Sequence, residues 1–351
     1  MRKVNLLRSI TILSIAIMFM GCLKPNQSEV SEGAWSEPFI GTFNIDGSGV
    51  DLLTSVYNNS LSGARPYFVK DIAGNDEEII LLDLLNSIEL MSLDGNNRRT
   101  ILDSLGGVEY FNQERTKMLL QKDGEIYLCK VDGSELTNIT NTPDIYEREP
   151  SFSYDEESII YTALISSGNL SISNIYEYQI ATNEVSILYD YEEIPQSYSY
   201  SRIFEPAKLS SEKISYKFLT DPDIVGNYTV NSLMKYDLQE DFVEELCTDL
   251  AYINYSHSKE FLAYNRSEDG YLVNLLTGDI TSFDCGSTYP SYSFSESDRY
   301  LCMDIGVLDL HSNTKYHFSD SNFFKKYNTV EQVHMNMNED RLIGIVRFLH
   351  Y

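Results

Sequence analysis

The sequence predicts an all-β fold built from one repeated four-stranded unit, and three observations support it. Two kinds of strand–turn–strand segment alternate along the chain from residue 39 to residue 346. Their turns are rich in Asp-Gly, Asn and Ser, the residue types that tight hairpins require. After residue 21, no segment has the apolar spacing of a long amphipathic helix.

One stretch displays the repeat clearly. Residues 131–163 read VDGSELTNITNTPDIYEREPSFSYDEESIIYTA, which gives a tight turn, a Thr-rich strand, a connector with Glu-Pro, and a second hairpin. The first kind of hairpin recurs at residues 39–54, 88–103, 125–140, 175–189, 232–247, 270–284 and 306–319. The second kind recurs at residues 65–82, 108–121, 149–163, 205–218, 251–265, 289–304 and 330–346.

The spacing of the repeats predicts a seven-bladed β-propeller. Turns of the first kind fall 35 to 56 residues apart, and about 40 to 50 residues are usual for a four-stranded blade. A unit consists of a second-kind hairpin followed by a first-kind hairpin. The chain starts with the second half of a unit, a first-kind hairpin, and ends with the first half of one, a second-kind hairpin. Residues 39–54 should therefore complete a blade with residues 330–346, closing the ring and protecting its edges. Six blades remain the alternative, because the second and fifth units are weak.

The units resemble the TolB-like branch of the WD-type β-propeller repeats. The residues that carry the likeness are Asp132-Gly133, Leu136-Thr137, Thr140, Glu149-Pro150, Phe152-Ser153 and the strand 159–161, with Pro290, Tyr292 and Ser293 in the sixth unit. The resemblance covers about residues 38–348 and implies a propeller. TolB itself has a further N-terminal domain before its propeller, whereas only a short tether precedes the repeats here.

The N-terminus predicts export and a lipid anchor. Arg2, Lys3 and Arg8 precede a short apolar run, which Gly21 and Cys22 close. The run is too short to span a bilayer and has the flanks of a signal peptide. Gly-Cys resembles a bacterial lipobox, so we expect a signal peptide at 1–21, lipidation of Cys22, a tether at 22–36 and a propeller at 37–351. The alternatives are a plain membrane anchor or a secretory signal with a chance cysteine.

The net charge and the cysteines of the sequence limit which partners and metal sites are expected. The formal net charge is −27, and removal of residues 1–21, with three basic and no acidic residues, lowers it to −30. Such a surface repels phosphate backbones, so nucleic acid is not expected as a partner. The four later cysteines match no zinc spacing. We expect them to be buried apolar residues, although Cys285 and Cys302 are candidates for a disulfide.

The candidate binding residues lie where connectors enter the innermost strands. Five long segments, at 55–64, 141–149, 190–205, 219–230 and 320–329, should gather on one face around the channel. Four residues each precede a proline and should surround the channel mouth: Arg65, Glu149, Glu205 and Tyr289. Tyrosine and arginine are enriched at binding hot spots, which adds Tyr146, Arg148, Tyr198, Tyr200 and Arg202.

The sequence carries no motif for catalysis, cofactor or metal. It lacks GxSxG, HExxH, a P-loop and GxGxxG. We therefore expect a monomeric, extracytoplasmic binding module of the bacterial cell envelope that holds an envelope protein or a glycan. The alternatives are a propeller-type carbohydrate-active enzyme, a lyase or hydrolase for which a carboxylate pair such as Glu149 and Glu205 could do acid–base work, and a structural part of an envelope assembly.

Overall fold

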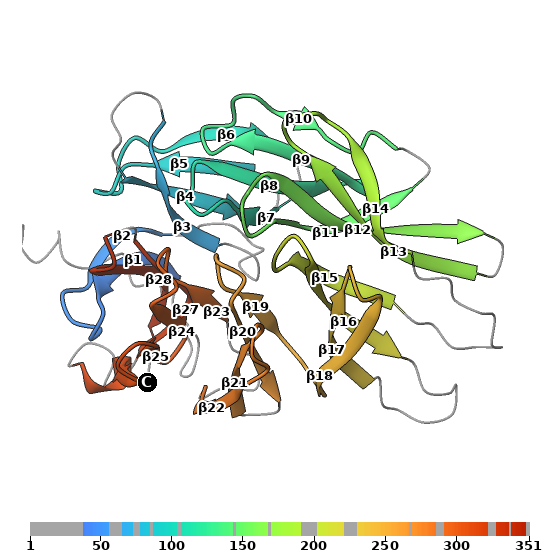
Figure 1. Cartoon of the computed structure of the whole chain (residues 1–351). Helices are drawn as coiled ribbons and strands as arrows, with labels where there is room; N and C mark the ends of the chain where they lie inside the picture. The colour runs from blue at the N-terminus through green and yellow to red at the C-terminus, as the bar shows by residue number, and fades with distance from the viewer. Residues whose placement is uncertain are drawn as a thin grey trace, which may run out of the picture.

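The computed structural model describes thirteen parts of the chain, which form seven four-stranded antiparallel sheets. These parts are residues 38–55, 65–72, 78–84, 87–103, 107–142, 145–167, 170–190, 202–220, 230–266, 269–285, 291–321, 328–336 and 338–348. The sheets surround a common axis as the blades of a propeller (Figure 1). The prediction of seven blades is confirmed.

Each of the first three blades uses four consecutive strands. Blade 1 contains β3 (Arg65–Lys70), β4 (Glu78–Leu84), β5 (Ser87–Met91) and β6 (Arg99–Asp103). Blade 2 contains β7 (Val108–Phe111), β8 (Lys117–Lys122), β9 (Glu125–Lys130) and β10 (Thr137–Asn138). Blade 3 contains β11 (Tyr146–Phe152), β12 (Ser158–Ser167), β13 (Leu170–Gln179) and β14 (Val185–Tyr189).

Blades 4 to 6 follow the same order. Blade 4 contains β15 (Arg202–Lys208), β16 (Lys213–Thr220), β17 (Val230–Asp237) and β18 (Phe242–Thr248). Blade 5 contains β19 (Ile253–Tyr255), β20 (Phe261–Arg266), β21 (Asp269–Asn274) and β22 (Ile280–Asp284). Blade 6 contains β23 (Tyr292–Phe294), β24 (Tyr300–Met303), β25 (Gly306–Asp309) and β26 (Thr314–His317), followed by the short 3-10 helix η2 (Phe318–Asp320). Among the described residues, no helix is long and apolar enough to cross a membrane.

Blade 7 closes the ring with strands from both ends of the chain. β27 (Asn328–Met335) and β28 (Arg341–Phe348) pair with β1 (Phe39–Asn44) and β2 (Asp51–Ser55). Figure 1 shows the blue N-terminal strands beside the red C-terminal ones. β1 runs antiparallel to β28, with Gly41 opposite Gly344. The predicted closure is confirmed, and the propeller has no free edge at the join.

The turn after the innermost strand has the same hydrogen bond and backbone conformation in five blades. A Ser or Asn side chain accepts the backbone N–H of the residue five positions later, at 2.7–3.1 Å. The residue three positions later has a positive φ of 52° to 61°. The Ser or Asn residues are Asn112, Ser153, Ser256, Ser295 and Asn336, and the positive-φ residues are Arg115, Glu156, Lys259, Asp298 and Glu339. A short polar side chain thus replaces a ladder hydrogen bond and holds the tight turn.

Several of these turns hold neighbouring blades together. Asp298 accepts the backbone N–H groups of His257 and Ser258, both at 2.8 Å. Glu339 accepts the backbone N–H of Ser297 at 3.1 Å, and Glu156 accepts that of Gln113. The carboxylate at the positive-φ corner of one turn therefore binds the turn of the preceding blade, because it accepts two hydrogen bonds from that turn.

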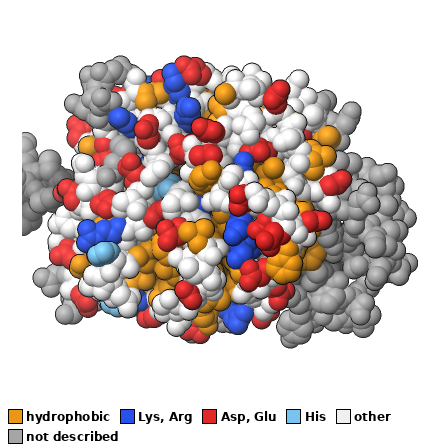
Figure 2. Space-filling model, viewed as in Figure 1, with side chains coloured by type: hydrophobic (Ala, Val, Ile, Leu, Met, Phe, Trp, Pro, Cys, Tyr) orange, Lys and Arg blue, Asp and Glu red, His pale blue; other side chains and the backbone are white. Residues whose placement is uncertain are grey.

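The hydrophobic core lies between adjacent sheets, not at the axis. Leu119 and Ile126 of blade 2 pack with Phe152 and Ile159 of blade 3, and equivalent clusters fill the other spaces. Cys129, Cys285 and Cys302 are buried and form no disulfide, so the candidate Cys285–Cys302 bridge is not formed. Each thiol packs as a small apolar group. On the outer surface, acidic side chains are scattered across the visible face (Figure 2).

Candidate functional site

The axis of the propeller contains two hollows with volumes of about 190 Å³ and about 330 Å³. Both are lined by Arg65, Glu109, Tyr110, Asn254 and Tyr255. Tyr110 of blade 2 reaches across the axis to blade 5, where its hydroxyl lies 3.4 Å from the carbonyl oxygen of Tyr255. The smaller hollow is also lined by residues of blades 6 and 7, and the larger hollow by residues of blades 3 and 4.

A buried lysine contacts Tyr110, which lines both hollows. Lys259 is 1% exposed, and its Nζ donates a hydrogen bond to the hydroxyl of Tyr110 at 2.7 Å. The same ammonium lies 4.1 Å from the centre of the Tyr110 ring. Burial lowers the pKa of Lys259 to about 7, because desolvation disfavours the ammonium. A hydrogen bond and a cation–π contact thus hold the Lys259 ammonium against Tyr110.

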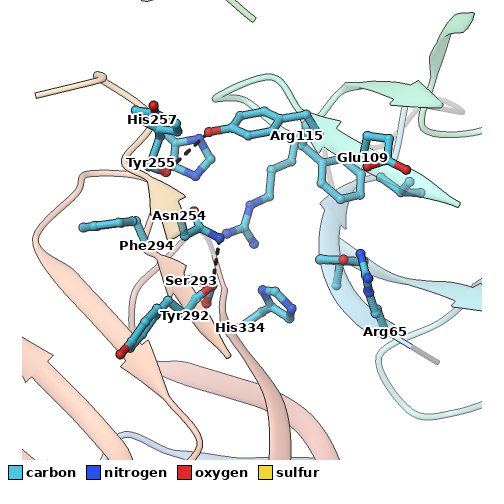
Figure 3. A pocket seen from close by; sticks show the side chains of 14 residues that line it. Arg65, Glu109, Arg115, Asn254, Tyr255, His257, Tyr292, Ser293, Phe294 and His334 are labelled. Carbon is cyan, nitrogen blue, oxygen red and sulfur yellow. Dashed lines mark hydrogen bonds between the residues drawn. The ribbon is translucent and has the colours of Figure 1, made fainter. Parts of the chain in front are cut away.

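The smaller hollow is lined by two neutral histidines and crossed by an arginine (Figure 3). Burial, with a smaller contribution from the positive charge of Arg115, lowers the pKa values of His257 and His334 to about 3. Arg115 donates to the carbonyl oxygens of Phe68 at 3.1 Å and Met335 at 2.8 Å. These bonds join blades 1, 2 and 7, so Arg115 is held as a structural cross-link.

The larger hollow is framed by two equivalent Glu-Pro bulges. The pairing register of β11 shifts between Arg148 and Ser151, and that of β15 shifts between Phe204 and Ala207. Glu149 and Glu205 have φ values of 54° and 49°. Proline cannot donate to the ladder, so a bulge forms where it follows the glutamate. A positive φ at a non-glycine residue costs on the order of 1–3 kcal/mol, which the surrounding structure must offset.

The two glutamates lie against each other, and one oxygen has no partner. Oε2 of Glu149 accepts the backbone N–H of Glu205 at 2.8 Å. Oε2 of Glu205 is buried and forms no hydrogen bond with any described residue. Burial raises the pKa of Glu149. Burial raises the pKa of Glu205 to about 7, where the charge of Lys217 opposes the rise and the charge of Glu149 adds to it. Near neutral pH the carboxyl of Glu205 therefore changes easily between its acid and its carboxylate form.

Further carboxyl groups line or approach the wall that the two hollows share. Burial raises the pKa of Glu109, and Arg65 opposes this rise. Asp83, behind the wall, accepts the backbone N–H of Val108 at 3.2 Å. Burial raises the pKa of Asp83 to about 7 against the opposing charge of Arg65. Arg65 thus faces several carboxyl groups that have lost much of their water.

The structure brings together three of the residues that the sequence singled out: Arg65, Glu149 and Glu205 line the larger hollow. Tyr146 does not; it is 50% exposed and packs against Gly124 in the β8–β9 turn. The guanidinium of Arg148 lies 4.4 Å from the centre of the Phe204 ring. Arg202 begins β15, and its side chain lies outside the described part of the chain.

Other predicted features also fall outside the described residues. They are Cys22, Tyr198, Tyr200 and Tyr289, and most of the long segments at 55–64, 190–205, 219–230 and 320–329.

Sequence reasoning missed the residues at one repeated position of the innermost strands. The second residue before each Ser or Asn of the turn lines a hollow in five blades: Tyr110, Ser151, Asn254, Ser293 and His334. Three of them also join neighbouring blades, because Ser151, Asn254 and Ser293 donate to the carbonyl oxygens of Pro206, Tyr292 and Val333 at 2.6–2.8 Å. Alignment of the repeats on the turn Ser or Asn would have revealed this position.

The described residues contain no group of three or more His, Cys, Asp or Glu side chains placed to hold a metal ion. What the larger hollow offers is a set of hydrogen-bond acceptors beside aromatic rings. Carboxylates and the Asn254 amide can bind hydroxyl or ammonium donors. The Glu149–Glu205 pair could also exchange a proton with a bound molecule.

Comparisons with known proteins find similar folds among solved structures but no match in sequence. No protein-family model matches the chain, and no curated protein matches its sequence significantly. A solved oligogalacturonate lyase in complex with manganese is similar over 92% of this chain and 99% of its own, with 9% identity and a TM-score of 0.50. An oligogalacturonate lyase from Vibrio parahaemolyticus is similar over 90% of this chain and 98% of its own, with 8% identity and a TM-score of 0.43.

The tricorn protease is similar over 82% of this chain and 37% of its own, with 12% identity and a TM-score of 0.43. At such low identities the likeness extends to the propeller fold alone.

Proposed function

We propose that this chain is a glycan-binding β-propeller that takes its ligand in the larger hollow. The observation that carries the proposal is the buried Oε2 of Glu205, an acceptor with no partner that belongs to a residue lining a hollow of about 330 Å³. An unmade buried hydrogen bond costs about 1–3 kcal/mol, and sugar hydroxyls are donors that would satisfy it. The hollow has the size of small-molecule sites, which begin at roughly 300 Å³.

The composition of the wall supports a carbohydrate rather than a flat protein surface. Tyr110 and Tyr255 supply aromatic rings, and Asn254 and Glu149 supply further polar groups. A recessed hollow of this volume admits one sugar unit or a chain end, whereas protein interfaces need a contact area of about 800 Å² on each partner. A protein partner that binds the outer face remains an outcome that the experiment below would reveal.

The proposed place of action is the outside of a bacterial cell. It rests on the signal-like residues 1–21, the lipobox-like Gly21-Cys22 and the TolB-like repeat. A lipid on Cys22 would keep the propeller near the membrane, and a single acyl chain would bind only reversibly. Mass spectrometry of the protein from a bacterial membrane fraction tests this step. A mature N-terminus at an acylated Cys22 is expected, and an unmodified Cys22 would contradict it.

The glycan proposal is tested by screening the full chain, purified in detergent, against an array of neutral, acidic and amino-substituted oligosaccharides. The Glu205→Gln variant should lose binding to the glycans that the native chain retains. Glu240→Gln is the matched control, because Glu240 lies exposed in the β17–β18 turn. Equal glycan binding by Glu205→Gln and the native chain would move the site away from the hollow. Capture of a protein but no glycan would contradict the glycan assignment.

A carbohydrate-active enzyme is the second candidate, and one observation favours it. Glu205 has a pKa raised to about 7 and lies beside Glu149, a combination suited to a general acid next to a second carboxyl group. Incubation of each bound oligosaccharide with the native chain, followed by mass spectrometry of the products, tests it. Cleavage that Glu205→Gln abolishes would support an enzyme, and intact oligosaccharide would leave binding as the function.

A further inference from the structure

The carboxylates around the larger hollow feel the positive charges of Arg65, Arg148 and Lys217 but have no direct ionic contact with a described residue. Within the described parts of the chain, none of Glu109, Glu149 and Glu205 forms an ion pair. Among the described residues that line this hollow, Arg65 is the only basic one. Lys217 influences Glu149 and Glu205 electrostatically, but its Nζ lies 3.5 Å from the carbonyl oxygen of Ala251. Three carboxyl groups therefore face one guanidinium across a cavity.

The carboxyl groups of the larger hollow are preorganised to bind a positively charged ligand group. Glu149 is held by its bond from the Glu205 backbone, and both glutamates are fixed by bulges with positive φ. The buried Oε2 of Glu205 has no donor among its neighbours. A buried carboxylate is normally paired, because removing it from water without a partner is costly. An ammonium group supplies both the missing charge and up to three N–H donors.

We propose that the larger hollow binds the ammonium group of an amino sugar, held by Glu149, Glu205 and Glu109. This inference rests on the glycan-binding function proposed above and names the class of glycan. The aromatic rings of Tyr110 and Tyr255 suit the sugar face, and Asn254 suits its hydroxyl groups. The net charge of −27 also attracts cationic ligands and raises their local concentration.

The test compares two probes of the same length that differ in charge: a trisaccharide of glucosamine and the corresponding trisaccharide of N-acetylglucosamine. Calorimetry with the full chain in detergent measures both dissociation constants. We expect the native chain to bind the amino form about tenfold or more tightly, since hydrogen bonds to charged groups contribute more than neutral ones. Glu205→Gln should remove most of this preference, and Glu240→Gln should retain it.

A second variant tests whether the lost preference reflects the whole set of carboxyl groups or only a local change at Glu205. Glu109→Gln keeps the shape of a lining side chain on a different blade and should reduce the same preference. Thermal unfolding of each variant, followed by circular dichroism, confirms that it folds. If the native chain binds both trisaccharides equally, the ammonium site is wrong and glycan binding stands. If neither trisaccharide binds while another glycan does, the amino-sugar assignment is wrong. If no glycan binds at all, both proposals fail.

Discussion

Replacement of Glu205 by Gln should change how the stability of the propeller depends on pH. Burial raises the pKa of Glu205 from 4.5 to about 7 in the folded protein. One pKa unit corresponds to about 1.4 kcal/mol, so the ionised carboxylate is disfavoured by about 3 kcal/mol in the fold. Between pH 4.5 and about 7 the folded chain binds this proton more tightly than the unfolded chain does. The stability that Glu205 contributes is complete below pH 4.5 and is lost as the pH rises through about 7.

The Gln variant lacks this titration and keeps the shape of the side chain. Its free energy of unfolding, relative to the native chain, should therefore rise by about 3 kcal/mol between pH about 5 and about 8. Urea unfolding followed by circular dichroism at several pH values measures the difference. Glu147 and Asp83, whose pKa values burial also raises to about 7, are present in both chains and largely cancel.

The exposed Glu240 supplies the control. Glu240→Gln is measured in the same way, because Glu240 lies exposed in the β17–β18 turn. If the difference between Glu205→Gln and the native chain does not change with pH, the carboxyl of Glu205 titrates normally and the account of a desolvated, unpartnered group is wrong. A difference of opposite sign would mean that Glu205 has a strong positive partner.

Three further predictions test the fold. Truncation after Asn338 removes β28, the strand between β1 and β27, and should abolish cooperative thermal unfolding; a cooperative transition near the native temperature would contradict ring closure. Gly306→Ala should cost about 3 kcal/mol in urea unfolding, since its Cβ would lie 2.1 Å from the carbonyl oxygen of Tyr316, whereas Gly278→Ala should cost about 1 kcal/mol because only its φ of 81° opposes it. Lys259→Met should remove a rise in native stability between pH about 7 and 10.5, the window in which the folded chain binds fewer protons than the unfolded one; identical pH profiles for the two chains would refute a desolvated Lys259.

Most of the fold followed from local signals in the sequence. All fourteen predicted hairpins are present, because Asp-Gly, Asn and Ser turns and alternating strands specify each hairpin from residues close in the chain. The Glu-Pro pairs also marked the innermost strands, and Glu149 and Glu205 reached the hollow as their place before proline indicated. Tyr146 did not, since it belongs to the same strand but packs outward on Gly124.

The sequence by itself predicted the hairpins and the closure of the ring, because hairpin formation and the hydrophobic pattern of each unit are local properties, and the structure decided for seven blades over six. Only the tertiary structure decided which carboxyl groups lose their water and where the axis is hollow. The contact of Tyr110 with Tyr255 joins residues 145 positions apart, and both residues line the two hollows. Glu149 and Glu205, 56 positions apart, meet only when blades 3 and 4 pack together. Burial and charge pairing depend on such distant neighbours, so the chemistry of the hollow arises from the assembled ring.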